Sequence, residues 1–371
     1  MRSSEYMYYE VNGQRTPNTL QAFEWANGDK NKIKFYWADD EHKKYDWTKE
    51  PTETIDELID QRVRELRDKY SHLCLWYSGG YDSQTILDSF VRTGTRLDEI
   101  LIFNREWIKP VNGINIEQED PKNYALFVKK NFQPHLKITF VDMKGDTAYK
   151  FYKQHGTDWI YHDTGHYPWF SKTSRQTMDT LQDNFKSITE IIGRRDIEGA
   201  EKPSLNLFNG KWYAVVNDKT YNWHMDVDRE LFYISPEATK LYIKQIWLAI
   251  KWFENHPLCS HEFVHKIQSQ KYDDLTYQSW NLGFGRKMAQ SRYEKVAYIK
   301  RHFGSGSDNM RNWWQDYAYK DNEDLFKVWR NGLQYIHQKY KGVWSYSTGF
   351  PVIMGEQIYI KDYVKNESLS D

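Results

Sequence analysis

The chain has 371 residues, and its 51 basic and 52 acidic side chains give a formal net charge of −1. This balance disfavours a simple polycationic nucleic-acid binder, and a hydrophobic share of 39% excludes a wholly disordered chain. Cys74 and Cys259 are the only cysteines, which excludes a disulfide framework, a four-cysteine zinc site and an iron–sulfur cluster. With no signal-peptide core and no apolar run long enough to span a membrane, we expect a cytoplasmic protein without a membrane partner.

The first fifty residues predict a small β element. YMYYEV precedes an Asn-Gly pair, and KIKFYW follows Asn27-Gly28, both patterns typical of hairpins. Residues 52–70 then predict an amphipathic helix, with one of two threonines at its start as the cap.

Strands and helices alternate over the next part of the chain. Apolar segments predict buried strands at 73–77, 99–103, 136–142 and 189–193. Segments with a helical period predict helices at 84–94, 121–132, 147–155 and 174–185. Such alternation is typical of an α/β fold with a mostly parallel sheet and right-handed crossovers.

The pattern changes after about residue 200. Asn209-Gly210 between two apolar runs predicts a hairpin, and Pro236 opens a mainly helical stretch that reaches about residue 340. The terminal segment PVIMGEQIYIKDYV predicts a strand or hairpin. We therefore divide the chain into an N-terminal β element at 1–50, an α/β domain at 51–205, and a hairpin with a helical C-terminal lobe at 206–371.

The strongest local pattern is the SGGYDS turn between the first buried strand and its helix. Gly79 and Gly80 let the backbone curl and approach a ligand closely. Successive amide groups and the helix N-terminus suit a phosphate, to which Ser78 and Ser83 can add hydroxyl donors. Asp82 suits a Mg²⁺ ion bridged to phosphates. The alternative is an ordinary Gly-rich turn with a serine cap.

This turn resembles the PP-loop of the ATP pyrophosphatase superfamily, whose pattern is SGGxDS or SGGxDT. Members of that superfamily share a Rossmann-like sheet, cleave ATP between its α and β phosphates, adenylylate a substrate and release pyrophosphate. The resemblance implies ATP and Mg²⁺ as ligands, with Asp82 as a catalytic residue and metal ligand. The nucleotide-binding residues that it implies are Ser78, Gly79, Gly80, Tyr81, Asp82, Ser83, Phe103, Asn104 and Gly193. No Walker A pattern GxxxxGK[ST] is present.

A second segment, residues 172–202, is similar to the branch of phosphoadenylylsulfate reductases and ATP sulfurylase small subunits. In that branch a helix containing Lys-Thr leads into a strand that ends in Gly-x-Arg-x-x-Glu. Gly193, Arg195 and Glu198 match this pattern, and Arg194 is an additional cation.

The second resemblance implies further catalytic residues. A strand of the same sheet would bring Arg194 and Arg195 to the carboxyl edge, where a guanidinium can grip phosphate with two hydrogen bonds. Lys172 is the third catalytic cation that it implies. The alternative is a surface arginine pair bonded to Glu198 or Asp196.

Three features depart from that branch. Tyr81 stands where the branch usually has lysine, and the second strand ends in Phe103-Asn104 where the branch has an Asp-containing turn. No cysteine follows Cys259, so the C-terminal nucleophile of the reductases has no counterpart. Reductase chemistry is therefore not expected.

We expect an ATP-dependent adenylylating enzyme of the nucleotidyltransferase or AMP-forming ligase type. Its acceptor is a small molecule or a nucleic acid, and an oligomer is compatible with the sequence. A basic stretch within 280–345 keeps a nucleic-acid-modifying enzyme open. A non-catalytic nucleotide-binding module is the other alternative.

Overall fold

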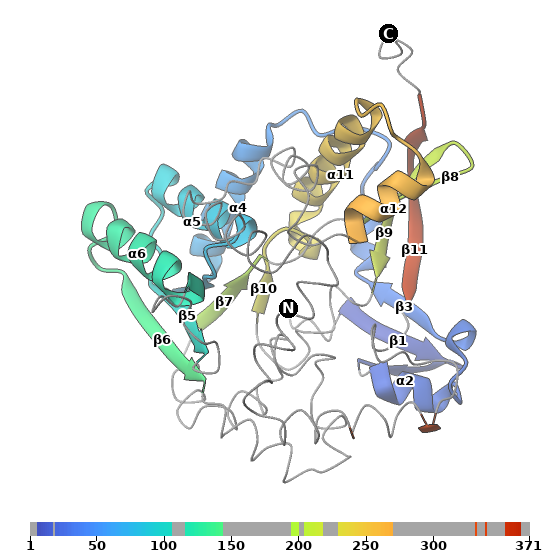
Figure 1. Cartoon of the computed structure of the whole chain (residues 1–371), viewed down its shortest axis with the longest axis horizontal. Helices are drawn as coiled ribbons and strands as arrows, with labels where there is room; N and C mark the ends of the chain where they lie inside the picture. Colours follow the sequence, from blue (N-terminus) through green and yellow to red (C-terminus); the bar gives the residue numbers. More distant parts are fainter. Residues whose placement is uncertain are drawn as a thin grey trace.

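Three β-sheets and the helices between them make up the described part of the chain (Figure 1). This computed structural model describes residues 6–17, 19–105, 116–143, 194–199, 204–217, 229–269, 331, 338–339 and 353–364. The predicted segments at 147–155, 174–185 and 189–193, and the helices predicted from 270 to 330, lie outside these residues.

The largest sheet has five strands in the order β10-β7-β4-β5-β6, and every neighbouring pair is parallel. Its strands are β4 (His72–Trp76), β5 (Glu99–Arg105), β6 (Lys137–Met143), β7 (Arg194–Glu198) and β10 (Arg229–Leu231). Strands β4, β5 and β6 confirm three of the predicted apolar strands. Along the chain, β5 and β6 extend the sheet on one side of β4, whereas β7 and β10 extend it on the other. The strand order therefore reverses between β4 and β7.

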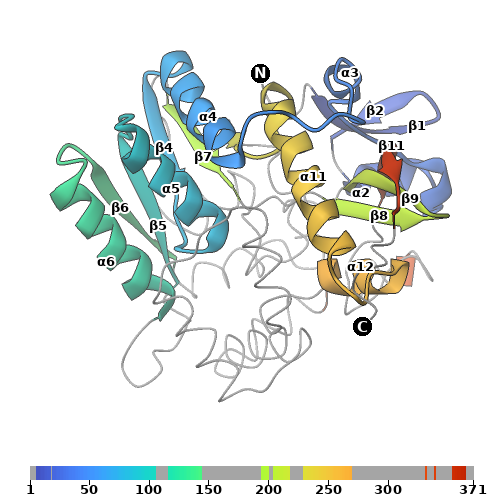
Figure 2. The ribbon, with the colours of Figure 1, turned by 90° about the horizontal axis from the view of Figure 1, so that it is seen from above.

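Three helices lie side by side along one face of this sheet: α4 (Ile55–Lys69), α5 (Tyr81–Thr93) and α6 (Ile116–Asn131) (Figures 1 and 2). Thr54 caps α4 in a capping box with Glu57, and Gly94 ends α5 with a positive φ of 65°, as predicted. Helix α6 begins before the predicted start, because Pro121 lies inside the helix instead of opening it.

The N-terminal residues form a small antiparallel sheet, as predicted. Its strands β1 (Met7–Val11), β2 (Gln14–Thr16) and β3 (Lys34–Trp37) are ordered β2-β1-β3. Asn27-Gly28, however, ends the unpredicted helix α2 (Thr19–Trp25), and the Gly28 amide donates to the Phe23 carbonyl at 2.8 Å. A left-handed Asn-Gly pair suits helix ends as well as hairpins, which explains the difference.

The third sheet joins the middle of the chain to its end. It contains β8 (Ser204–Phe208), β9 (Lys211–Asn217) and β11 (Met354–Asp362), and the predicted Asn209-Gly210 turn connects β8 to β9. Helix α12 (His261–Ser269) covers the free edge of β8, where the Gln268 side chain bonds both the amide and the carbonyl of Leu205.

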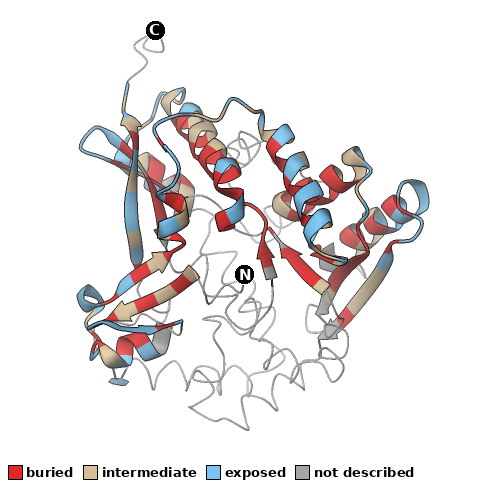
Figure 3. Ribbon diagram, turned by 180° about the vertical axis from the view of Figure 1, so that it is seen from behind, coloured by how far each residue is buried: buried red, intermediate tan, exposed pale blue. Residues whose placement is uncertain are grey.

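Helix α11 (Thr239–Glu254) lies between the central sheet and the third sheet. It contacts α4 on one side and β8 on the other, and most of its residues are buried (Figure 3). The described residues share one apolar core. Strands β8 and β9 belong to the third sheet, but β10, which follows them in the chain, belongs to the central sheet. The α/β domain and the C-terminal part, predicted to divide at residue 205, are therefore interleaved along the chain. No helix within the described residues is long and apolar enough to cross a membrane.

Candidate functional site

The SGGYDS turn lies at the carboxyl edge of β4, in the middle of the central sheet. The Tyr77 amide still bonds the Leu101 carbonyl of β5 at 2.9 Å, and the chain then leaves the sheet and enters α5 within three residues. Gly80 is the N-cap of α5 and supplies no capping side chain. The first-turn N–H groups of a helix are the donors that an anion can satisfy at such an end.

The two glycines of the turn differ in their backbone requirements. Gly79 has φ +68°, in the left-handed region where only glycine fits at little cost, and it lies against Pro121 of α6. Gly80 has φ −76°, and a Cβ atom placed there would lie 3.4 Å from the Ser78 hydroxyl, close to ordinary contact. The fold of the turn therefore requires the first glycine but not the second.

The two serines meet inside the turn. Ser83 Oγ accepts a hydrogen bond from the Ser78 amide at 3.2 Å and lies 3.3 Å from Ser78 Oγ. Ser83 is buried, whereas Ser78 is exposed and Asp82 is half-buried in the first turn of α5. Both hydroxyls and one carboxylate are thus held within the same six residues.

Phe103 and Asn104 extend β5 past the end of β4. Leu101 pairs with Trp76, so the two later residues lie beyond the last paired residue of β4, on the side of the turn. The half-buried Phe103 ring lies 4.7 Å from the Trp76 ring. The structure therefore brings the predicted residues 78–83, Phe103 and the backbone of Asn104 to one edge of the sheet. The Tyr81 side chain is buried.

The two arginines lie at the opposite edge of the sheet. Arg194 pairs with His72 and Arg195 with Leu73, and these are the first two residues of β4. The expectation that they reach the carboxyl edge is wrong. The described strand is the RRDIE segment itself, so the arginines begin this strand instead of following one. The five residues of β4 separate the arginines from the turn, which corresponds to roughly 16 Å along a strand.

Both arginines have structural partners at the amino edge. The Arg194 side chain is buried and bonds Glu99 and Asp196, each at 2.6 Å. Arg195 stacks on Tyr70, with its guanidinium carbon 4.5 Å from the ring centre. The alternative of a surface pair named the right partner for Arg194, Asp196, but placed the pair wrongly, because both side chains are buried. Lys172 and Gly193 lie outside the described residues.

Glu99 is the centre of this amino-edge cluster, and the sequence analysis missed it. Besides Arg194, the fully buried carboxylate meets Lys137 at 3.1 Å and His72 at 3.3 Å. Burial alone would raise the pKa of Glu99. The hydrogen bond from Thr139 and the charges of Arg194 and Lys137 outweigh burial and lower this pKa. The signal in the sequence was that titratable residues begin four neighbouring strands, namely Arg194 in β7, His72 in β4, Glu99 in β5 and Lys137 in β6.

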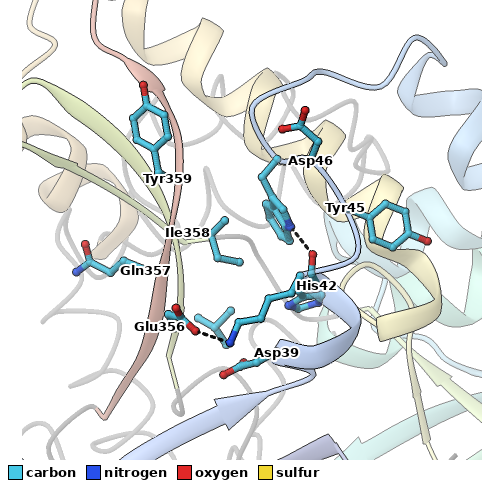
Figure 4. Close-up of a pocket in the computed structure, with 11 residues that line it drawn as sticks. Asp39, His42, Tyr45, Asp46, Glu356, Gln357, Ile358 and Tyr359 are labelled. Carbon is cyan, nitrogen blue, oxygen red and sulfur yellow. Dashed lines mark hydrogen bonds and ion pairs between the residues drawn. The ribbon is translucent and has the colours of Figure 1, made fainter.

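A cavity of about 330 Å³ lies elsewhere, between the residues that follow β3 and strands β9 and β11 (Figure 4). Its polar lining includes Asp39, Asp46, and Lys43, whose ammonium group pairs with Glu356 at 3.1 Å. No group of three or more potential metal ligands occurs among the residues that the structure describes. The described lining of the cavity therefore holds no such metal site.

Comparisons of the chain with models of protein families, with curated proteins and with solved structures find no match. The turn at the carboxyl edge of β4 is thus the feature from which a function can be inferred. It combines a helix N-terminus, two hydroxyls, a carboxylate and a neighbouring aromatic ring.

Proposed function

We propose that this chain is an ATP-dependent adenylylating enzyme that binds ATP at its SGGYDS turn and releases pyrophosphate. The position of the turn is the observation that best supports the proposal. It follows the central strand β4, opens helix α5 and lies where the strand order reverses. Ligands of open α/β sheets bind at such a point, and the order β6-β5-β4-β7-β10 suits a Rossmann-like fold of the PP-loop type.

In the proposed reaction an acceptor oxygen forms a bond to the α-phosphorus of ATP. The bond between that phosphorus and the oxygen bridging to the β-phosphate breaks, and pyrophosphate leaves with the electron pair. Negative charge develops on the leaving group. The N-terminal end of α5 and the hydroxyls of Ser78 and Ser83 would stabilise this charge.

Asp82 is the residue that would hold Mg²⁺ in this proposal. Its carboxylate is half-buried in the first turn of α5, one residue before Ser83, and oxygen ligands are those that Mg²⁺ prefers. The ion would neutralise charge on the phosphates.

The position of the arginines limits the proposal to the superfamily level and removes the support for one particular branch. With Arg194 and Arg195 at the amino edge, nothing in the described residues favours the branch of phosphoadenylylsulfate reductases and ATP sulfurylases. The acceptor remains either a small molecule or a nucleic acid.

Gly80→Ala tests the proposal, because the fold of the turn tolerates a methyl group there. A phosphate that approaches the backbone would meet this methyl group. We expect the variant to bind the α,β-methylene analogue of ATP with Mg²⁺ about tenfold more weakly or worse, by isothermal titration calorimetry. Its free energy of unfolding should fall by no more than about 1 kcal/mol, the scale of an alanine at an N-cap.

Gly94→Ala is the matched control, because Gly94 ends the same helix and has φ 65°. It should lose about 1 kcal/mol of stability or more and keep its affinity for the analogue. An unchanged affinity in Gly80→Ala, or no binding by the unmodified protein, would refute the nucleotide site. Binding without pyrophosphate release in the presence of any acceptor would favour a non-catalytic module.

A further inference from the structure

Tyr233 connects the SGGYDS turn to the other half of the molecule. It follows β10, its ring is fully buried, and its hydroxyl donates to the backbone carbonyl of Asp82 at 2.8 Å. The backbone carbonyl of Tyr233 itself accepts a hydrogen bond from the side chain of Gln245 in α11 at 3.1 Å. A side chain that follows the edge strand β10 thus contacts the first turn of α5.

Gly199 makes room for this contact. It comes directly after β7, and a Cβ atom placed there would lie 2.9 Å from the Tyr233 ring and would also collide with Ile86 of α5. The end of the Ile86 side chain is nearer still, at 2.3 Å, and both side chains are fully buried, so an added methyl group would displace both. The end of β7, the segment after β10 and the start of α5 are therefore packed together just behind the turn.

The Tyr233 hydroxyl adds a hydrogen bond that helps to hold one peptide group of α5 in its orientation. The carbonyl of Asp82 and the amide N–H of Ser83 belong to the same planar peptide unit, and no peptide bond in the described chain is cis. In a trans unit the two groups point in opposite directions. A hydrogen bond that holds the Asp82 carbonyl therefore aims the Ser83 N–H toward the turn, among the donors at the N-terminus of α5.

We propose that Tyr233 is a positioning residue that aims the Ser83 amide at a phosphate group of the bound nucleotide. This inference rests on the proposed function, since that function supplies the phosphate. Tyr233 does not touch the nucleotide. It acts through the backbone of Asp82, and Gly199 is needed because a larger residue would displace the ring.

Tyr233→Phe tests this role by removing one hydroxyl. We expect about fivefold weaker binding of the α,β-methylene analogue of ATP with Mg²⁺, the change expected for one misaligned hydrogen bond. Adenosine, which has no phosphate, should bind Tyr233→Phe as it binds the unmodified protein. With the analogue bound, the Ser83 amide should exchange its hydrogen about tenfold faster in the variant than in the unmodified protein, as measured by NMR. A purely structural role for Tyr233 would not separate the two ligands.

Tyr70→Phe is the matched control, because its hydroxyl bonds Glu230 at 3.2 Å at the amino edge. Tyr70→Phe should leave the affinities for the ATP analogue and for adenosine unchanged. If Tyr233→Phe unfolds, Gly199→Ala, which displaces the ring and keeps the hydroxyl, should show the same loss for the analogue alone. Equal affinities of Tyr233→Phe and the unmodified protein for the analogue, or an equal loss for adenosine, would overturn the role.

The Ser83 amide separates failure of this role from failure of the proposed function. If the unmodified protein binds no nucleotide, the proposed function fails, and the positioning of a phosphate donor falls with it. If the nucleotide binds but the Ser83 amide exchanges equally fast in the two nucleotide-bound proteins, the positioning role alone is refuted.

Discussion

His42 shows how a single residue can make the stability of this protein depend on pH. It is 1% exposed, packs against the rings of Trp47 and Tyr242, and has no hydrogen-bond partner at either ring nitrogen. Burial lowers the pKa of His42 from 6.5 to about 4. The unfolded chain therefore binds a proton between these pH values that the folded protein does not bind. The stability that neutral His42 contributes is present above pH 6.5 and is lost as the pH falls toward 4.

His42→Phe should remove this dependence, because phenylalanine fills the same aromatic site without titrating. Between pH 7.5 and pH 5, the unmodified protein should lose about 2 kcal/mol more unfolding free energy than the variant. Urea denaturation of both proteins at both pH values measures the difference. The other histidines and the carboxyl groups are common to both proteins and cancel. Parallel losses in the two proteins would show that His42 is protonated without cost in the folded state.

At the scale of elements, Arg194 ties three neighbouring strands together at the amino edge. It belongs to β7, lies 2.9 Å from the sulfur of Cys74 in β4, and reaches Glu99 at the start of β5. Arg194 is the main cation shared by two buried carboxylates, those of Glu99 and Asp196. Its role is therefore to hold strands in register.

Arg194→Met should destabilise the sheet without affecting the turn at the other edge. Removing one partner of a buried ion pair leaves charge without compensation, so we expect a loss of about 3–5 kcal/mol in unfolding free energy. Affinity for the ATP analogue, measured on the folded variant, should be unchanged. Lys43→Met, which breaks an exposed pair with Glu356, is the control and should change stability little. A folded Arg194→Met protein of normal stability that no longer binds nucleotide would reverse this assignment.

The same strands show what the sequence could predict at this scale. Strands β4 and β5 are buried on both faces, so in the sequence they are short, continuous apolar runs, a pattern typical of strands in a parallel sheet. Strand β7 carries RRDIE, in which Arg194 pairs with Asp196 of the same strand and with Glu99, 95 positions away. In the sequence alone, such a charged segment resembles a surface loop. The turn was predictable because its residues are contiguous, whereas Tyr233 reaches it from 151 positions away.

At the scale of the whole molecule, the two ends of the chain form one unit. Strand β11 pairs with β9 and also packs against β3 of the N-terminal sheet. Gly355 marks the tightest point of this packing. A Cβ atom placed on it would lie 3.2 Å from the Val216 carbonyl of β9 and 3.4 Å from the Phe35 carbonyl of β3. The predicted N-terminal element is therefore held in place partly by the last strand of the chain.

Gly355→Ala should loosen both ends of the chain together. Both neighbours of the added methyl group are backbone carbonyls within strands, which cannot turn aside as a side chain can, so β11 must move. We expect a loss of about 1–2 kcal/mol, the scale of mild overpacking. Hydrogen exchange should be about tenfold faster in both β3 and β11 and unchanged in β4 and β5. Met354→Ala, at the exposed neighbouring position, should leave all four strands unaffected. Faster exchange in β11 alone would mean that the N-terminal sheet does not depend on the C-terminal strand.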